Sequence, residues 1–464
     1  MSLVQSLGNV FSACTQANVI AELVYLWDNA DVPDSPEAIA VAAACENVFD
    51  DLIVVLENRG WTVFPSPPGP ERVTGKDISY LGSWKLKSRK GWEYATNLEV
   101  CWVPDRGLLL SNKGGTVGYV DFGGLPPSLD PNAAHTVDWS GALFDVSTAA
   151  KGLTVNAGTL GGLAYLPGAD RLWAGLYEFY NTAGRDNLGL ISFAPDLSGG
   201  VKGAWRTGPA SDSWTCPEIT GLNCSRWVDP ATLKVFHANK CHEWVVTIPS
   251  SWSEKYAPGM LLASGRQRPA GAFGGAQGPA LYAFVGDEAR GPGHHQDGTP
   301  LIAYPTGSRT FQPGYWNAQG DDSGTGCAWV ETKSGKRGVL FCWSAPLGGG
   351  NWYGQPGPPC NAEKGWHSKV ASTGAWPEWA PLLHLYDDAD LGAVMLGDLA
   401  PWQVQPAETV DLSGDIWMPN PGQGCEGPFV TGLAWDGEGE VLYGVQPKAG
   451  GVATQAVVHA WKVS

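Results

Sequence analysis

The sequence has little charge, and less positive than negative charge. Its 464 residues include 29 Lys and Arg against 46 Asp and Glu, a net charge of −17. Charged residues amount to 16 %, below the roughly 25 % of ordinary soluble domains. A chain this acidic is not expected to bind nucleic acid or an anionic membrane surface, which attract basic proteins. Hydrophobic residues still amount to 43 %, enough for a folded core, so a disordered chain is excluded.

Targeting and membrane-spanning segments are lacking as well. The first residues, MSLVQSLGNVFSAC, contain no Lys or Arg and therefore lack the basic region of a secretory signal peptide. No apolar run reaches the roughly 18 residues that a membrane-spanning helix needs. We therefore expect neither a signal peptide nor insertion into a membrane.

Several catalytic motifs are missing. No Ser has Gly two residues before and two residues after it, which excludes the nucleophile elbow of α/β-hydrolases. His242-Glu243 is not followed by a second His one helical turn later, so the zinc-protease helix is excluded, and no Gly-Lys-Ser/Thr phosphate loop occurs. We predict no catalytic residue and no cofactor, which favours a function other than catalysis.

Residues 1–60 have the pattern of two helices. The second begins at Ser35 and Pro36, a helix-start signal, and ends at Arg59 and Gly60. Its apolar residues recur at steps of three and four, as in a packing seam, at Val41, Cys45, Val48, Leu52 and Val55. A Pro-rich stretch over residues 65–70 follows. We predict a domain of residues 1–70, a helical hairpin with a linker, that docks on other subunits of an assembly through Val41, Val48, Leu52 and Val55.

Residues 71–464 have the pattern of many short strands. A unit recurs in which small residues precede a hydrophobic strand, a tight turn and a second hydrophobic strand. Units begin near residues 98, 162, 222, 280, 327 and 432. The aromatic residues on these strands are expected in the core, namely Trp102, Tyr165, Trp173 and Trp435. One helix is predicted, over residues 387–396.

An all-β chain with a repeat of this length is similar to a β-propeller. The resemblance covers residues 75–464 and favours six blades, with five or seven as alternatives. It implies that the last strand, Val457–Val463, pairs with residues around Ile78–Leu86 and so hides both sheet edges. The sequence signatures of the named propeller families are absent, so no catalytic residue is transferred from them. The predicted fold class is therefore mainly β, a β-propeller preceded by an α-helical hairpin.

One cluster of Cys and His residues deserves comparison with metal sites. Thiolates and imidazoles are the ligands that zinc prefers, but the spacing here matches no standard zinc motif. We predict no metal and keep as weak candidates Cys216, Cys224, His237, Cys241 and His242. The ten cysteines of the chain are spread along it, and both free buried thiols and a few disulfides are compatible with that distribution.

Two loop clusters are candidates for ligand binding. A Gly- and Pro-rich loop carries His294, His295 and Asp297, a combination that can transfer protons or bind a ligand. Aromatic residues beside amides in Gly-rich segments can stack on a sugar or anchor a protein partner, and these are Tyr315, Trp316, Trp352 and Tyr353. The alternative is that these rings fill gaps between blades.

Taken together, these patterns favour a non-enzymatic structural or adhesion protein. We expect a subunit of a large assembly, a phage or virion component such as a tail protein, that displays a propeller to a surface glycan or a protein receptor. Its location would then be the virion, or the extracellular space after lysis. Two alternatives stay open: a cytoplasmic scaffold propeller that binds protein partners, and a hydrolase or lyase that acts on a glycan at the channel mouth.

Overall fold

The computed structural model describes residues 71–87, 99–112, 114–130, 133–153, 159–177, 188–207, 242–266, 277–294, 296, 298–304, 323–347, 351–353, 366–368, 378–416, 430–447 and 455–464. The chain divides into two units, Met1–Gly69 and Pro70–Ser464, and every described residue lies in the second. The predicted helical hairpin, with Val41, Val48, Leu52 and Val55, lies outside the described residues and stays a prediction.

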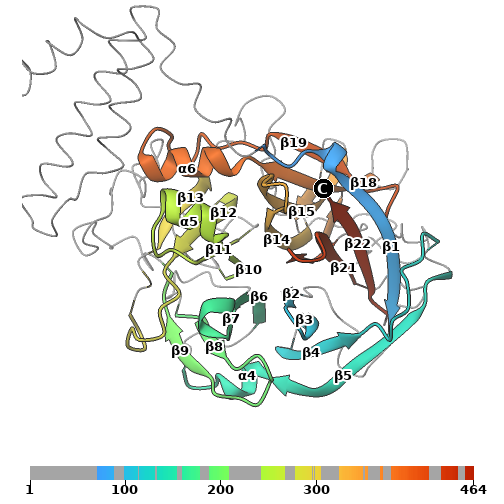
Figure 1. Ribbon diagram of the computed structural model, residues 1–464, viewed down its shortest axis with the longest axis horizontal. Coiled ribbons are helices and arrows are strands. Elements are labelled where there is room, and N and C mark those ends of the chain that lie inside the picture. The colour runs from blue at the N-terminus through green and yellow to red at the C-terminus, as the bar shows by residue number, and fades with distance from the viewer. Residues whose placement is uncertain are drawn as a thin grey trace, which may run out of the picture. The chain divides into compact units, whose positions relative to one another are not determined.

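The described strands form antiparallel groups of four (Figure 1). One group contains β2 (Val100–Val103), β3 (Gly107–Ser111), β4 (Thr116–Asp121) and β5 (Thr136–Asp145). The next contains β6 (Thr159–Leu166), β7 (Arg171–Tyr177), β8 (Leu190–Phe193) and β9 (Lys202–Trp205). A third contains β10 (Trp244–Thr247), β11 (Leu262–Arg266), β12 (Gln277–Phe284) and β13 (Thr299–Tyr304). A fourth contains β14 (Ser323–Glu331), β15 (Arg337–Leu347), β18 (Glu378–Tyr386) and β19 (Glu408–Asp411).

The remaining group is built from both ends of this unit. It contains β20 (Gly432–Asp436), β21 (Val441–Gln446), β22 (Val457–Val463) and β1 (Ile78–Leu86). Strands β1 and β22 pair antiparallel from Ile78 opposite Val463 to Lys85 opposite Val457, which confirms the predicted pairing of the terminal strand. A short parallel pairing of β1 with β5 joins this group to the first in one eight-stranded sheet.

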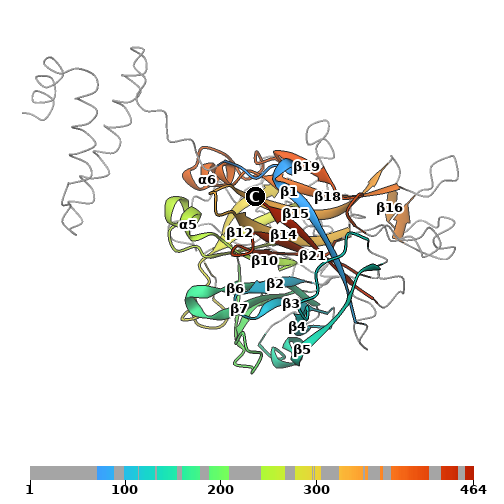
Figure 2. The same ribbon diagram turned by 45° about the vertical axis from the view of Figure 1, so that its right-hand side comes forward.

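The first strands of the five groups contact one another in a closed series. β2 contacts β6, β6 contacts β10, β10 contacts β14, β14 contacts β20, and β20 contacts β2. Two glycines of β6 let its backbone approach β10: a Cβ on Gly161 would lie 1.7 Å from the His242 carbonyl oxygen, and one on Gly162 would lie 1.6 Å from the Val245 nitrogen. Figure 2 shows β2, β6, β10, β14 and β21 crowded at the centre of the same unit.

The hydrophobic core lies between neighbouring groups rather than in one central mass. Because side chains alternate between the two faces of a strand, each inner strand contributes side chains to two hydrophobic clusters, one on each face. Cys101 and Val103 of β2 pack toward β6, whereas Val100 packs toward β20. Other clusters lie between the β6 and β10 groups, the β10 and β14 groups, and the β14 and β20 groups. Every pair of neighbouring groups is therefore joined by buried apolar side chains.

Few helices accompany the strands within the described residues. They are η1 (Gly75–Asp77), α4 (Val146–Ala149), η3 (Pro167–Ala169), α5 (Ser250–Tyr256) and α6 (Asp388–Leu396). Helix α6 confirms the one helix predicted for residues 71–464, and Asp387 caps it by accepting a hydrogen bond from the Ala389 amide. Helices α5 and α6 contact each other at the outside of the β10 and β14 groups (Figure 1). A further pair of strands, β16 (Asn351–Tyr353) and β17 (Trp366–Ser368), forms a separate ribbon.

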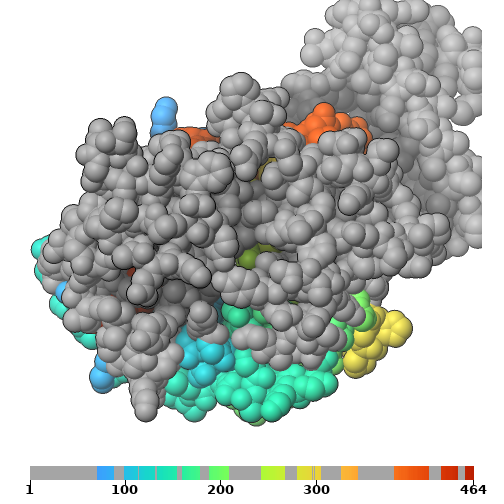
Figure 3. Space-filling view, turned by 180° about the vertical axis from the view of Figure 1, so that it is seen from behind, coloured from blue at the N-terminus to red at the C-terminus, as the bar shows by residue number. Residues whose placement is uncertain are grey.

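The described fold is mainly β, with several sheets, and is consistent with a β-propeller-like architecture. Seen from behind, the cyan-to-green segments of the β2 and β6 groups reach the surface along the lower edge (Figure 3). The repeat units that begin near residues 98, 162, 280, 327 and 432 correspond to paired strands. The unit near residue 222 lies outside the described residues, and the six-blade count is not confirmed. In the part of the chain that is described, no helix has the length and apolar character needed to cross a membrane.

Candidate functional site

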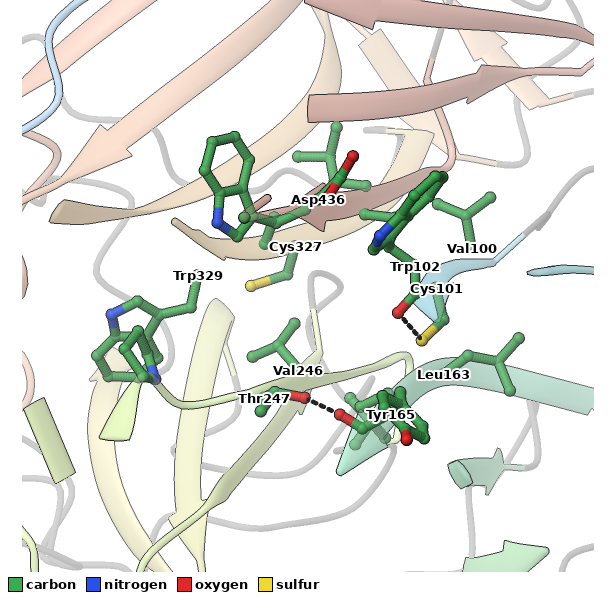
Figure 4. A pocket seen from close by; sticks show the side chains of 18 of the residues that line it. Val100, Cys101, Trp102, Leu163, Tyr165, Val246, Thr247, Cys327, Trp329 and Asp436 are labelled. Atoms are coloured by element: carbon green, nitrogen blue, oxygen red, sulfur yellow. Dashed lines mark hydrogen bonds between the residues drawn. The ribbon is translucent and has the colours of Figure 1, made fainter. Parts of the chain in front are cut away.

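The inner strands surround a cavity of about 370 Å³. Each of β2, β6, β10, β14 and β20 contributes lining residues, and Figure 4 shows labelled residues of these strands around the cavity. A volume of this size falls in the range of small-molecule sites, about 300–1,000 Å³.

The cavity has an apolar floor and an exposed rim. Most of its buried lining residues are small or aliphatic, namely Val100, Cys101, Leu163, Ala164, Val245, Val246, Cys327, Ala328, Leu433 and Ala434; Trp329 and Asp436 are buried as well. Residues that follow the ends of the strands are exposed, among them Pro104, Pro167, Gly437 and Glu438. The cavity therefore opens where the inner strands end.

Aromatic side chains lie between the floor and the rim. They occupy the same position of the repeated hairpin: Trp102 on β2, Tyr165 on β6, Trp329 on β14 and Trp435 on β20. On β10 this position is Thr247. The prediction that these rings belong to the core holds for Trp173, which is 0 % exposed. It holds only in part for Trp102, Tyr165 and Trp435, which are half-buried: they pack against the core clusters and also line the cavity.

Neighbouring rings hold two of these aromatic residues in place. The Trp102 ring stacks on Tyr443, with centroids 5.2 Å apart and planes 7° apart. Trp329 is only 3 % exposed and meets the fully buried Trp252 edge-on, with centroids 4.7 Å apart. Rings fixed in this way lose little freedom when a ligand binds, so the wall is preorganised.

Hydrogen bonds fix Tyr165 at the mouth of the cavity. The Thr247 hydroxyl donates to the Tyr165 carbonyl oxygen at 2.7 Å, which ties β10 to β6. The Tyr165 hydroxyl donates to Asp170 Oδ1 at 2.9 Å. Burial, together with the acceptor carboxylate of Asp170, raises the pKa of the Tyr165 hydroxyl. The phenol thus stays neutral and presents an electron-rich ring.

Three carboxylates complete the lining: Glu331, Asp436 and Glu438. Asp436 is nearly buried, and its Oδ1 accepts the amides of Glu438 at 3.1 Å and Gly439 at 3.0 Å. Glu331 accepts a hydrogen bond from the Ser251 hydroxyl and lies 3.8 Å from Arg337 Nη1. The mouth is therefore aromatic and acidic.

The two thiols of the floor are not suited to nucleophilic chemistry. Cys101 and Cys327 are buried free cysteines, as is Cys342 on β15, so free thiols are confirmed for the described cysteines. Burial raises the pKa of the Cys101 thiol to about 12 and that of Cys327 well above its usual value. Because the thiolate is the reactive form, these side chains act as small apolar groups.

His242 is the described member of the predicted Cys and His cluster. It is 1 % exposed; its Nε2 lies 2.9 Å from the Thr207 hydroxyl and its Nδ1 lies 3.3 Å from the Leu176 carbonyl oxygen. Within the described residues no group of three or more His, Cys, Asp or Glu side chains could hold a metal ion. The other candidates, Cys216, Cys224, His237 and Cys241, lie outside the described residues.

The predicted ligand-binding loops are described only in part. His294 is exposed, and its backbone pairs with Arg206. His295, Asp297, Tyr315 and Trp316 lie outside the described residues. Trp352 and Tyr353 belong to β16, but their side chains lie outside the described part. These sites stay predictions.

The aromatic residues of the cavity recur at one position of the repeat, and this pattern predicted core packing rather than a site. Trp102, Tyr165, Trp329 and Trp435 each lie one or two residues before the end of an inner strand, which is followed by a turn containing Pro, Gly or Asp. A propeller places such strand ends around one mouth. The repeated aromatic position therefore indicates a set of aromatic side chains arranged around that mouth. The three carboxylates of the lining, Glu331, Asp436 and Glu438, do not recur at a repeated position, so no sequence pattern identified them.

Similarity to known proteins is found among solved structures. No protein-family model matches the chain, and no curated protein sequence does. Among solved structures, the chain is similar to the holo form of the pyranose dehydrogenase PQQ domain from Coprinopsis cinerea. The identity is 12 %, the alignment covers 85 % of this chain and 98 % of that domain, and the TM-score is 0.30. A TM-score this low does not establish a shared fold.

Proposed function

We propose that the chain is a ligand-binding β-propeller-like protein whose site is the mouth of the central cavity. The observation that carries the proposal is the set of aromatic residues at one repeated position, beside carboxylates, around an apolar cavity. Exposed rings next to hydrogen-bonding groups are suited to stacking and orienting a small ligand or the end of a glycan. The described lining offers no activated nucleophile, which favours binding over catalysis.

We propose five blades for this propeller. In the described residues, the five inner strands contact one another in a closed series, and a hydrophobic cluster lies between each pair of neighbouring groups. A sixth blade between β6 and β10 would have to separate Gly162 from Val245, whose backbones are already in contact. Five blades supply the five lining strands of the cavity.

The experiment is a screen of the full chain against neutral oligosaccharides, with a matched pair of variants. Trp102→Leu removes a ring from the cavity. Trp139→Leu makes the same change at a half-buried ring that packs on the same hydrophobic cluster but does not line the cavity. We expect binding that is lost in Trp102→Leu and kept in Trp139→Leu. Equal binding by both variants would mean that the oligosaccharide binds outside the cavity.

A glycan hydrolase or lyase is the second candidate, because three carboxylates lie beside rings that could hold a sugar. Glycosidases use a pair of carboxylates on either side of the scissile bond. Release of new reducing ends during the same screen would favour the enzyme. Binding without cleavage supports the non-enzymatic function.

The role of residues 1–70 in an assembly is a separate proposal, taken from the sequence. Light scattering of residues 71–464 beside the full chain tests it. We expect the full chain to assemble and the shorter chain to stay a monomer; two monomers of equal stability would contradict a docking element.

A further inference from the structure

We propose that the cavity mouth binds a small alkylammonium ion, an inference that rests on the proposed ligand-binding function and names its ligand class. The juxtaposition that carries it is a set of fixed aromatic rings and three carboxylates around an apolar cavity. Of the described residues that line this cavity, none is a Lys or Arg.

The charge at the mouth is negative. Asp436 has its Oδ1 held by two backbone amides, and Glu438 follows it on the exposed rim. Arg337, near Glu331, directs its Nε to Asp388 Oδ2 at 2.7 Å, so its charge is largely engaged there. A cleft with walls of low dielectric and charges of one sign focuses the field at its mouth. An anionic ligand is therefore disfavoured and a cation attracted.

The rings select an organic cation. A cation within about 6 Å of an aromatic centroid is attracted by the negative face of the ring, and Trp is the best partner. Trp102, Tyr165 and Trp435 are half-buried and line the cavity. The hydrogen bond from the Tyr165 hydroxyl to Asp170 increases the electron density of that ring. Arg106 and Asp105 also act on Tyr165, with opposite signs.

A hydrated metal ion fits this mouth less well. Hard cations need several oxygen ligands that converge on one point, and within the described residues no group of side chains meets that requirement. An alkylammonium ion instead uses both features of the site, since its alkyl groups contact the apolar floor and its charge faces rings and carboxylates. The cavity volume of about 370 Å³ suits a small molecule.

The test is calorimetric titration of the full chain with choline and with neohexanol, the uncharged alcohol in which carbon replaces the ammonium nitrogen. Ionic strength is matched with sodium chloride. We expect choline to bind at least about tenfold more tightly than neohexanol, and binding to weaken as salt is added. Equal affinity for the two would overturn the proposal, since the site would then recognise shape alone. Absence of a choline response would overturn it too.

Two carboxylate variants locate the effect. Glu438→Gln removes an exposed charge from the rim, and Asp398→Asn removes an exposed charge after helix α6, outside the cavity lining. Because both side chains are exposed, both variants should fold. We expect Glu438→Gln to bind choline more weakly than the unchanged protein, and Asp398→Asn to bind it with unchanged affinity. The same loss in both variants would mean that only the net charge attracts choline, and this result would reject the site.

The failure of this inference is distinguishable from the failure of the proposed function. Oligosaccharide binding that Trp102→Leu abolishes, with no choline response, rejects the ammonium ligand and keeps the binding cavity. Failure of both ligands rejects both proposals.

Discussion

Replacing Gly162 by Ala should separate β6 from β10, two neighbouring inner strands that are in close contact. The new Cβ would lie 1.6 Å from the Val245 nitrogen and 2.0 Å from the Trp244 carbonyl carbon. Non-bonded heavy atoms normally keep about 3.5–4.0 Å apart, so β6 and β10 would have to move apart by about 2 Å. Neither obstacle is the end of a flexible side chain that could turn away.

The cost has two parts. Overpacking of a dense core costs about 1–3 kcal/mol. The Gly162 amide donates to the His242 carbonyl oxygen at 3.1 Å, and loss of that hydrogen bond adds about 1 kcal/mol. The sum, about 2–4 kcal/mol, is a sizeable part of the 5–15 kcal/mol that stabilises an ordinary protein. At about 2 °C for each kcal/mol in a large chain, the unfolding midpoint should fall by about 4–8 °C.

The assay is thermal unfolding followed by circular dichroism, with Gly168→Ala as the control. Gly168 lies in the exposed turn between β6 and β7, and a Cβ there would meet no atom within 4 Å. We expect Gly168→Ala to leave the midpoint within about 1 °C of the unchanged protein. Equal midpoints for the two variants would refute the close approach of β6 and β10, and with it the closed ring.

Other variants test the core and the ionisable groups. Arg337→Met leaves the buried Asp388 carboxylate without its partner at 2.7 Å and should cost about 3–5 kcal/mol; adding Asp388→Asn should recover much of this in urea unfolding, and no recovery would contradict the pairing. Burial lowers the pKa of both His384 and His459 to about 3. Because the unfolded chain takes up these protons near pH 6.5 and the folded chain does not, stability should fall as pH drops from 6.5 toward 3. The loss at pH 5 is about 2 kcal/mol for each histidine, and His459→Gln should flatten the profile; an unchanged profile would count against a buried neutral His459. Trp461→Ala empties a buried site in the closing strand β22 and removes a hydrogen bond to Asp415. We expect a loss of about 3–5 kcal/mol in the same unfolding assay, whereas a loss below 1 kcal/mol would contradict the buried position of Trp461 in β22.

Local patterns of the sequence determined the elements of this protein. Alternating apolar residues and turns of Gly, Pro and Asp predicted the hairpins of β2 with β3, β6 with β7, and β20 with β21. The sequence also predicted a helix over residues 387–396, where the structure has helix α6. The pairing of β22 with β1 was also predictable, since a propeller-like chain must hide two terminal edges and these were the strands available. Each of these inferences uses residues close in sequence or a general rule about sheet edges.

Only the tertiary structure decided how the groups meet and what lies at their centre. The six units counted along the chain carry no information on which strands touch, and contact of β6 with β10 depends on glycine backbones that no hydrophobic pattern reveals. Trp102 and Trp173 have similar surroundings in sequence, yet one lines the cavity and the other is fully buried. The difference arises because Trp102 lies on an inner strand and Trp173 on the second strand of its group, between two sheets. Exposure of an aromatic residue is set by long-range packing and not by local periodicity, since Trp329 also lies on an inner strand but packs on Trp252 and is only 3 % exposed.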